Sequence, residues 1–145
     1  YSEYPDGVID VAREQALVEE HQNIVLQFPV YWFNCPPLLK QWCDEVLTYG
    51  WAYGSKGKAF ENKKLGIAVS LGAPASEYSA EGSVGYTVAE TLRPFELTAN
   101  YISANYQPLF TFHTIDTYES YDEAAAQQVA DSADDYLAHL NTYYA

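Results

Sequence analysis

The chain has 145 residues, of which 20 are acidic and 7 basic, so its formal net charge is −13. This charge argues against nucleic acid or an anionic membrane surface as a partner, because phosphate contacts require clustered Lys and Arg. The length predicts a single domain over residues 1–145 with its own hydrophobic core. No apolar run approaches the ~20 residues of a membrane-spanning helix, and no signal peptide opens the chain, so we expect no membrane insertion.

Two cysteines and three histidines predict neither a disulfide nor a metal site. If Cys35 and Cys43 share one helix, a rise of ~1.5 Å per residue separates them by ~12 Å, too far for a disulfide. The histidines are scattered without metal-ligand spacing. The cytoplasm, a reducing compartment, is the simplest location. Cys35 is best interpreted as a buried small hydrophobe, with a redox thiol as the alternative.

The first half of the chain contains a helix, a strand and a second helix. Asp10 is a good N-cap for a helix over 11–20. The apolar run 24–28 predicts a buried strand, and the aromatic residues 31–33 then fall in a turn. Pro36 opens a helix over 36–47, since a proline is tolerated in a first helical turn. Open α/β sheets bind ligands at the carboxyl ends of their strands, so this strand, turn and helix are a candidate site.

A long loop and a second buried strand follow. Residues 49–64 are rich in Gly, Ser and Lys, and loops of this length are often functional. The apolar run 65–71 predicts a buried parallel strand. Residues 72–86 form a glycine-rich loop without a regular period, for which a surface turn is the alternative to a binding role.

The last third predicts a helix, a strand and a long helix. The first helix covers about 87–104, and Pro94 predicts a break with a fresh start. A third strand spans 108–114, and a helix with Ala and acidic residues spans 121–143. Strands that alternate with helices indicate a parallel α/β sheet, here with three strands.

Several separated motifs together resemble one family. The stretches QFPVYWFNCPPLLKQWCDEVL, YGWAYG and SLGAP with EYSAEGSVGY are similar to the flavodoxin-like NAD(P)H:quinone oxidoreductases. The ancillary flavoproteins of glutathione-gated potassium efflux systems form a closely similar branch. The resemblance implies an α/β flavodoxin-like fold with a parallel sheet in the order 2-1-3-4-5 and helices on both faces. The chain would supply strands three to five, and the first two strands and the phosphate-binding loop are expected to be absent from this sequence.

The resemblance also implies an activity. It predicts an FMN-dependent enzyme, with FAD as a possible cofactor, that takes a hydride from NAD(P)H and reduces a quinone or similar acceptor in a ping-pong cycle. A homodimer with the flavin site at its interface is implied as well. Two alternatives stay open: a regulatory flavoprotein subunit on a cytoplasmic face of a potassium efflux system, and a non-catalytic fragment that no longer binds flavin.

The resemblance assigns cofactor contacts to two loops. The loop that lies along the isoalloxazine ring corresponds to Pro29, Val30, Tyr31, Trp32 and Phe33. The loop whose backbone binds the polar edge of the ring corresponds to Ser70, Leu71, Gly72 and Ala73. The family usually has Thr-Thr-Gly-Gly or similar in the second loop, so Leu71 and Ala73 are departures, and approach at Ala73 would be tighter than at a glycine. Without the resemblance, the three adjacent rings would favour a core or interface role.

Five further positions are assigned by the same resemblance. Tyr78 matches a catalytic tyrosine that helps to stabilise charge during hydride transfer, although by itself it would be interpreted as a surface tyrosine. The histidine that accompanies it in mammalian members falls on Val84, so that relay is incomplete here. His113 is not part of this assignment: from its place at a strand end, it is interpreted as a core or edge histidine whose ring nitrogens are hydrogen-bonded. The substrate-binding positions are Trp51, Tyr53, Glu81 and Gly82, and the two aromatics are often contributed across the dimer interface.

Overall fold

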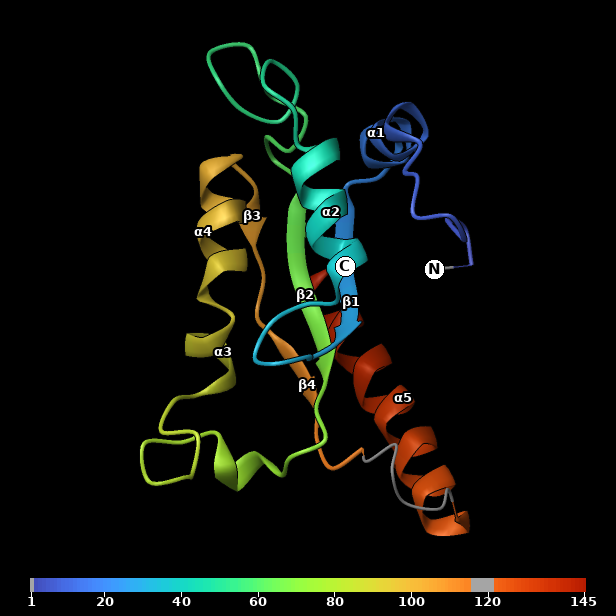
Figure 1. The fold of residues 1–145 in the computed structure, drawn as a ribbon, viewed down its shortest axis with the longest axis vertical. Helices are drawn as coiled ribbons and strands as arrows, with labels where there is room; N and C mark the ends of the chain where they lie inside the picture. The colour runs from blue at the N-terminus through green and yellow to red at the C-terminus, as the bar shows by residue number, and fades with distance from the viewer. Residues whose placement is uncertain (1, 116–121) are drawn as a thin grey trace.

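The computed structural model describes residues 2–115 and 122–145, and its centre is a sheet of four parallel strands (Figure 1). Strand β2 (Lys64–Ser70) is central. It pairs along its whole length with β1 (Asn23–Pro29), which forms one edge of the sheet. On its other side β2 pairs with β3 (Asn105–Tyr106) and then with β4 (Phe110–Phe112). The carboxyl ends of β1, β2 and β4 lie side by side, where Pro29, Ser70 and Phe112 are in register, whereas β3 pairs with the start of β2. We call the side of the sheet where these three strands end its carboxyl edge.

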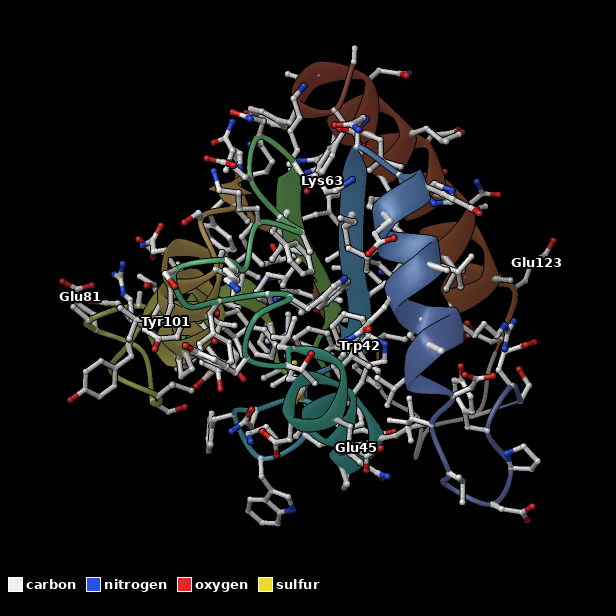
Figure 2. The ribbon with its side chains drawn as sticks, turned by 90° about the horizontal axis from the view of Figure 1, so that it is seen from above. Trp42, Glu45, Lys63, Glu81, Tyr101 and Glu123 are labelled. Atoms are coloured by element: carbon white, nitrogen blue, oxygen red, sulfur yellow. The ribbon has the colours of Figure 1, made fainter. Side chains whose placement is uncertain are left out.

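Helices cover both faces of this sheet. They are α1 (Val11–Glu20), α2 (Pro37–Val46), α3 (Val88–Thr91), α4 (Arg93–Tyr101) and α5 (Glu123–Tyr143), with a 3₁₀ turn η1 (Ala75–Glu77) after β2. Figures 1 and 2 show α2 on one side of the sheet and α5 on the other. The result is the three-layer α/β arrangement that the sequence predicted. In the described part of the chain, no helix is both long enough and apolar enough to cross a membrane.

The main core lies between the sheet and the α2–α4 layer. Ile67 and Val69 of β2 pack there with Phe28 of β1 and with Leu92, all less than 5% exposed. Because side chains alternate along a strand, Gly66, directly before Ile67, faces the opposite side of the sheet, where Tyr144 at the end of α5 covers it. β2 is thus buried on both faces, as expected for the central strand of a parallel sheet.

Gly66 leaves just enough room for the Tyr144 ring, and this close approach predicts a stability effect. A Cβ at position 66 would collide with the Tyr144 hydroxyl, which is held in place because Tyr144 is only 9% exposed. We expect Gly66→Ala to lower the free energy of unfolding by about 1–3 kcal/mol through overpacking, measured by urea denaturation. Adding Tyr144→Phe removes the colliding oxygen and should restore much of the loss. A double variant no more stable than G66A would contradict this account.

Most of the predicted helices and strands are confirmed, as are the residues that were predicted to start or interrupt helices. The Asp10 carboxylate accepts a hydrogen bond from the Arg13 N–H at 3.0 Å, which caps α1. The predicted break near Pro94 is present: α3 ends before Leu92, and α4 starts afresh with Pro94 in its first turn. Helix α5 is N-capped by Asp122, whereas Tyr121, the predicted start, lies outside the described residues.

Two predictions need correction. The third predicted strand, 108–114, is present as the shorter β4, and the separate strand β3 was missed because it has only two residues. Pro108 lies between β3 and β4, and a proline has no N–H for the ladder. Cys35 precedes α2 instead of sharing that helix with Cys43, and both thiols are free.

Candidate functional site

Two loops predicted separately to bind a cofactor meet at the carboxyl edge of β1 and β2. The Val30 N–H donates to the Ser70 carbonyl at 2.9 Å, directly after the last paired residues of the two strands, Pro29 and Ser70. The parallel register of β1 and β2 causes this contact, because it aligns the two strand ends. Residues 29–33 and 70–73 therefore form one continuous piece of backbone surface at the end of the sheet.

The first loop is a tight turn, Tyr31–Asn34, which we call the aromatic turn. The Tyr31 N–H donates to the Asn34 carbonyl at 2.8 Å, and the Asn34 N–H returns the bond at 3.0 Å. Trp32 and Phe33 have φ angles of 48° and 61°, a left-handed conformation that favours glycine or asparagine. The Trp32 side chain is 93% exposed. A strained turn that displays an aromatic ring in solvent has no packing reason within this chain, and strain of this kind is concentrated at functional sites.

Relieving this strain should stabilise the protein. We expect the double replacement Trp32→Asn and Phe33→Gly to raise the free energy of unfolding by about 1–2 kcal/mol, since a left-handed L-residue costs about that much, and Gly removes this cost at position 33 while Asn only lowers it at position 32. Urea denaturation provides the measurement. The matched control is Trp32→Ala with Phe33→Ala, which removes the same rings but keeps side chains that disfavour positive φ. Equal stability of the two double variants would show that the φ angles are not a source of strain.

The second loop, 70–73, is fixed by β4 and offers hydrogen-bond donors. The buried Leu71 donates its N–H to the Phe112 carbonyl at 2.8 Å and accepts from the Ile115 N–H at 3.1 Å. Its side chain joins the core, which explains the departure from the family pattern at this position. The N–H groups of Gly72 and Ala73 have no acceptor among the described residues. Among the described residues, a Cβ at Gly72 would meet only the Ile115 carbonyl, at 3.7 Å, so these residues leave room for a side chain there.

Tyr78 lies beside this loop, next to a histidine that the sequence had not assigned to the site. The Tyr78 ring packs against the main core, and burial raises the pKa of its phenol, which therefore keeps its proton at neutral pH. The His113 ring lies 6.0 Å from the Tyr78 ring between centroids, and its Nδ1 is 3.1 Å from the Ala73 carbonyl oxygen. The sequence could have indicated His113 as a site residue only through its position directly after β4, at the carboxyl edge.

Glu81 and Gly82, predicted to bind substrate, lie in the loop that follows η1. The Glu77 carboxylate accepts hydrogen bonds from the Ser83 N–H, at 3.3 Å, and from the Ser83 hydroxyl. A Cβ at Gly82 would collide with the Glu77 carbonyl, so the loop itself requires this glycine. Glu81 is exposed, and Figure 2 shows it at the outer edge of the molecule. Their substrate-binding role stays a prediction.

Trp51 and Tyr53 are not brought together with the other site residues. They lie in the loop between α2 and β2, which Figure 1 shows at the opposite end of the sheet from the loop after β2. The Trp51 Nε1 donates to Glu19 at 2.7 Å, and the Tyr53 ring lies 5.5 Å from that of Tyr101. Neither aromatic residue can therefore line a pocket at the carboxyl edge of its own chain.

The comparison with known proteins identifies the family. A family model described as the flavodoxin-like fold matches residues 2–140. The chain belongs to this flavodoxin-like family. A crystal structure of general stress protein 14 from Treponema denticola in complex with FMN is 64% identical, with a TM-score of 0.90, over 98% of this chain and 78% of that one. A structure named as an NADPH-quinone reductase from P. pentosaceus is 33% identical, with a TM-score of 0.74, over 87% and 73% of the two chains.

A relative from the efflux branch is also similar to this flavodoxin-like chain. KefG from Cronobacter sakazakii, named as a glutathione-regulated potassium-efflux system ancillary protein, is 44% identical over 99 residues. This match covers 68% of the chain and 54% of KefG, so the chain spans about half the length of that relative.

Other chemistry finds little support in the described residues of this flavodoxin-like chain. Burial raises the pKa of the Cys43 thiol to about 11 and also raises that of Cys35, so both thiols are protonated and poorly nucleophilic at neutral pH. Within 2–115 and 122–145, no group of three His, Cys, Asp or Glu side chains is placed to hold a metal ion.

Proposed function

We propose that the protein is an NAD(P)H oxidoreductase that uses FMN and reduces a quinone-like acceptor. The observation that carries the proposal is the contact between Val30 and Ser70, which sets the aromatic turn beside the N–H groups of Gly72 and Ala73, for which the described residues provide no acceptor. The FMN named in the Treponema denticola structure and the activity named for the P. pentosaceus protein support it.

The residues present suit a flavin. The polar edge of an isoalloxazine ring presents acceptors, which match the N–H donors of Gly72 and Ala73, and the open backbone at Gly72 allows a flat ring to approach closely. FAD would meet the same residues. Tyr78, protonated at neutral pH, can donate a hydrogen bond toward charge that develops nearby. When bound, FMN supplies the ring that accepts a hydride from NAD(P)H and passes two electrons to the acceptor.

We further propose a ping-pong cycle in a homodimer. If the aromatic turn covers one face of a bound flavin ring, NAD(P)H and the acceptor would use the other face in turn. The exposed rings of the aromatic turn are suited to a protein interface, where aromatic residues are enriched. Trp51 and Tyr53 can take part in a substrate pocket only if a second copy presents them to the carboxyl edge. Light scattering on the purified protein should give twice the mass of one chain.

The test of the activity is a titration of the purified protein with FMN, followed by addition of NADPH or NADH under nitrogen. We expect visible flavin bands that bleach on addition of the nucleotide and return when a benzoquinone is added. Initial rates at several quinone concentrations should give parallel double-reciprocal lines. If FMN does not bind at all, the enzyme proposal is wrong, and a non-catalytic chain remains.

The similarity to KefG supports a second candidate function, a regulatory subunit that binds a cytoplasmic face of a potassium efflux system. The two functions differ in a measurable way. A regulatory subunit should alter potassium efflux in vesicles that contain the transporter, and it should do so whether or not a quinone is present. An enzyme that acts alone should turn over quinone and leave efflux unchanged.

A further inference from the structure

We propose that His113 is a positioning residue of this site, which holds the Ala73 carbonyl and the Tyr78 ring and thereby favours the reduced form of bound FMN over the oxidised form. This inference rests on the proposed function. From the sequence alone, the place of His113 at a strand end predicts a hydrogen-bonded core or edge histidine with no role in the site.

The hydrogen bond between His113 and Ala73 defines the state of the imidazole. A carbonyl oxygen can only accept, so the Nδ1 atom, 3.1 Å from that oxygen, must carry the proton. The Ala73 carbonyl is the last acceptor of the 70–73 loop before Pro74, which has no N–H. With this carbonyl bound to His113, the peptide groups of Gly72 and Ala73 are held in one orientation, and their N–H groups remain as donors.

The same ring also contacts Tyr78. The two ring centroids lie 6.0 Å apart with an interplanar angle of 60°, which is within the range of a favourable aromatic contact. Tyr78 directly follows η1, and its N–H donates to Ala75 within that turn. His113 thus touches both ends of the segment from Ala73 to Tyr78, which contains the proposed cofactor loop end and the proposed catalytic phenol.

Backbone hydrogen bonds on both sides of His113 fix the orientation of its ring. Phe112 pairs with Ser70 in the sheet, and the bonds of Leu71 to Phe112 and Ile115 continue this pairing past the end of β2. Thr114, directly after His113, has a φ of 64°. A β-branched residue in the left-handed region is a true outlier, which persists only where the surroundings impose it. The strain at Thr114 therefore indicates that the surrounding structure fixes the backbone conformation at His113, and with it the orientation of the His113 ring.

These contacts predict an effect on the reduced cofactor. Reduction adds electron density to the polar edge of the flavin ring, so donors held in place there stabilise the reduced form more than the oxidised form. Without His113, the 73–78 segment loses a hydrogen bond and a ring contact, and its donors are less well oriented. We expect His113→Ala to weaken binding of reduced FMN about tenfold relative to oxidised FMN, which lowers the two-electron midpoint potential by about 30 mV.

Three variants separate the hydrogen bond from the ring contact. His113→Asn keeps an N–H donor near the Nδ1 position, His113→Phe keeps a ring beside Tyr78, and His113→Ala keeps neither. The midpoint potential of bound FMN should stay near the wild-type value in H113N and fall in H113F and H113A. His139→Ala is the matched control, since His139 lies on α5, 5.5 Å from the Phe110 ring, and its loss should lower stability without changing the potential.

A second measurement needs no cofactor. In nitrogen-15 spectra of the cofactor-free protein, the His113 ring should show its proton on Nδ1. Equal potentials for wild type, H113F and H113A would overturn the proposal, as would a proton on Nε2 only. If H113A does not fold, the comparison of H113F with H113N decides, because both keep a planar group. Failure of the wild type to bind FMN would instead disprove the proposed function, and this inference with it.

Discussion

Gly72→Val is expected to weaken FMN binding about a hundredfold, equal to about 2.7 kcal/mol, while the cofactor-free protein keeps its stability. The described part of the fold leaves room for a side chain here, because within it a Cβ would meet only the Ile115 carbonyl, at 3.7 Å, and no positive φ is required. The proposed ligand does not tolerate it, because a branched side chain would stand between the flat ring and the backbone donors of Gly72 and Ala73. The whole effect should therefore appear in binding.

The measurement is a titration followed by quenching of flavin fluorescence, together with thermal unfolding of the cofactor-free variant. Ala80→Val is a matched control, because Ala80 is an exposed small residue further along the same connection. It should leave both FMN affinity and stability unchanged. A G72V variant that binds FMN as tightly as the wild type would show that the 70–73 loop is not the cofactor loop.

Phe60→Ala is expected to lower the free energy of unfolding by about 3–5 kcal/mol, the usual cost of emptying a buried aromatic site. Phe60 is 1% exposed, although it lies in the long connection between α2 and β2. Its ring lies 5.7 Å from that of Trp51 in an edge-to-face arrangement, and it packs in one cluster with Val18 of α1 and Ala99 of α4. This residue therefore anchors the loop to the fold.

Urea denaturation measures this change, and Lys58→Ala serves as the control. Lys58 lies in the same loop, and its ion pair with Glu61, at 3.2 Å, is exposed on both sides. Exposed pairs contribute little, so this control should unfold like the wild type. Substitution of a buried aromatic residue by Ala usually costs far more than about 1 kcal/mol. A smaller loss of unfolding free energy for F60A would therefore show that the loop does not belong to the cooperative core.

The elements with a strong local signal were predictable. Asp10 ahead of α1, Pro36 ahead of α2 and Pro94 in the first turn of α4 each act within a few residues of their own position. The positions of the two loops at the ends of β1 and β2 were predictable for a related reason: each directly follows an apolar run short enough for a buried strand. Such features depend only on residues that are close together in the chain, and the sequence lists those residues directly.

Other features depend on residues distant in the chain. The two-residue strand β3 exists because Asn105 and Tyr106 lie beside β2, and no local pattern marks them. The left-handed conformation of Trp32 and Phe33 is a local exception: the turn between Tyr31 and Asn34 closes it, but it contradicts the preferences of both residue types, so the sequence does not predict it. The long loop 49–64 was expected to be functional, whereas Ala52 and Phe60 within it belong to the core.

The sequence by itself determined the helices, the main strands and the family, because periodicity, caps and motifs are local properties. Only the tertiary structure decided which candidate residues share a site. The parallel register of β1, β2 and β4 joins the aromatic turn, the 70–73 loop and His113 at one edge, and it leaves Trp51 and Tyr53 at the other. Strand pairing aligns residues that are 40 or more positions apart, such as Ala73 and His113, and no spacing in the sequence records that alignment.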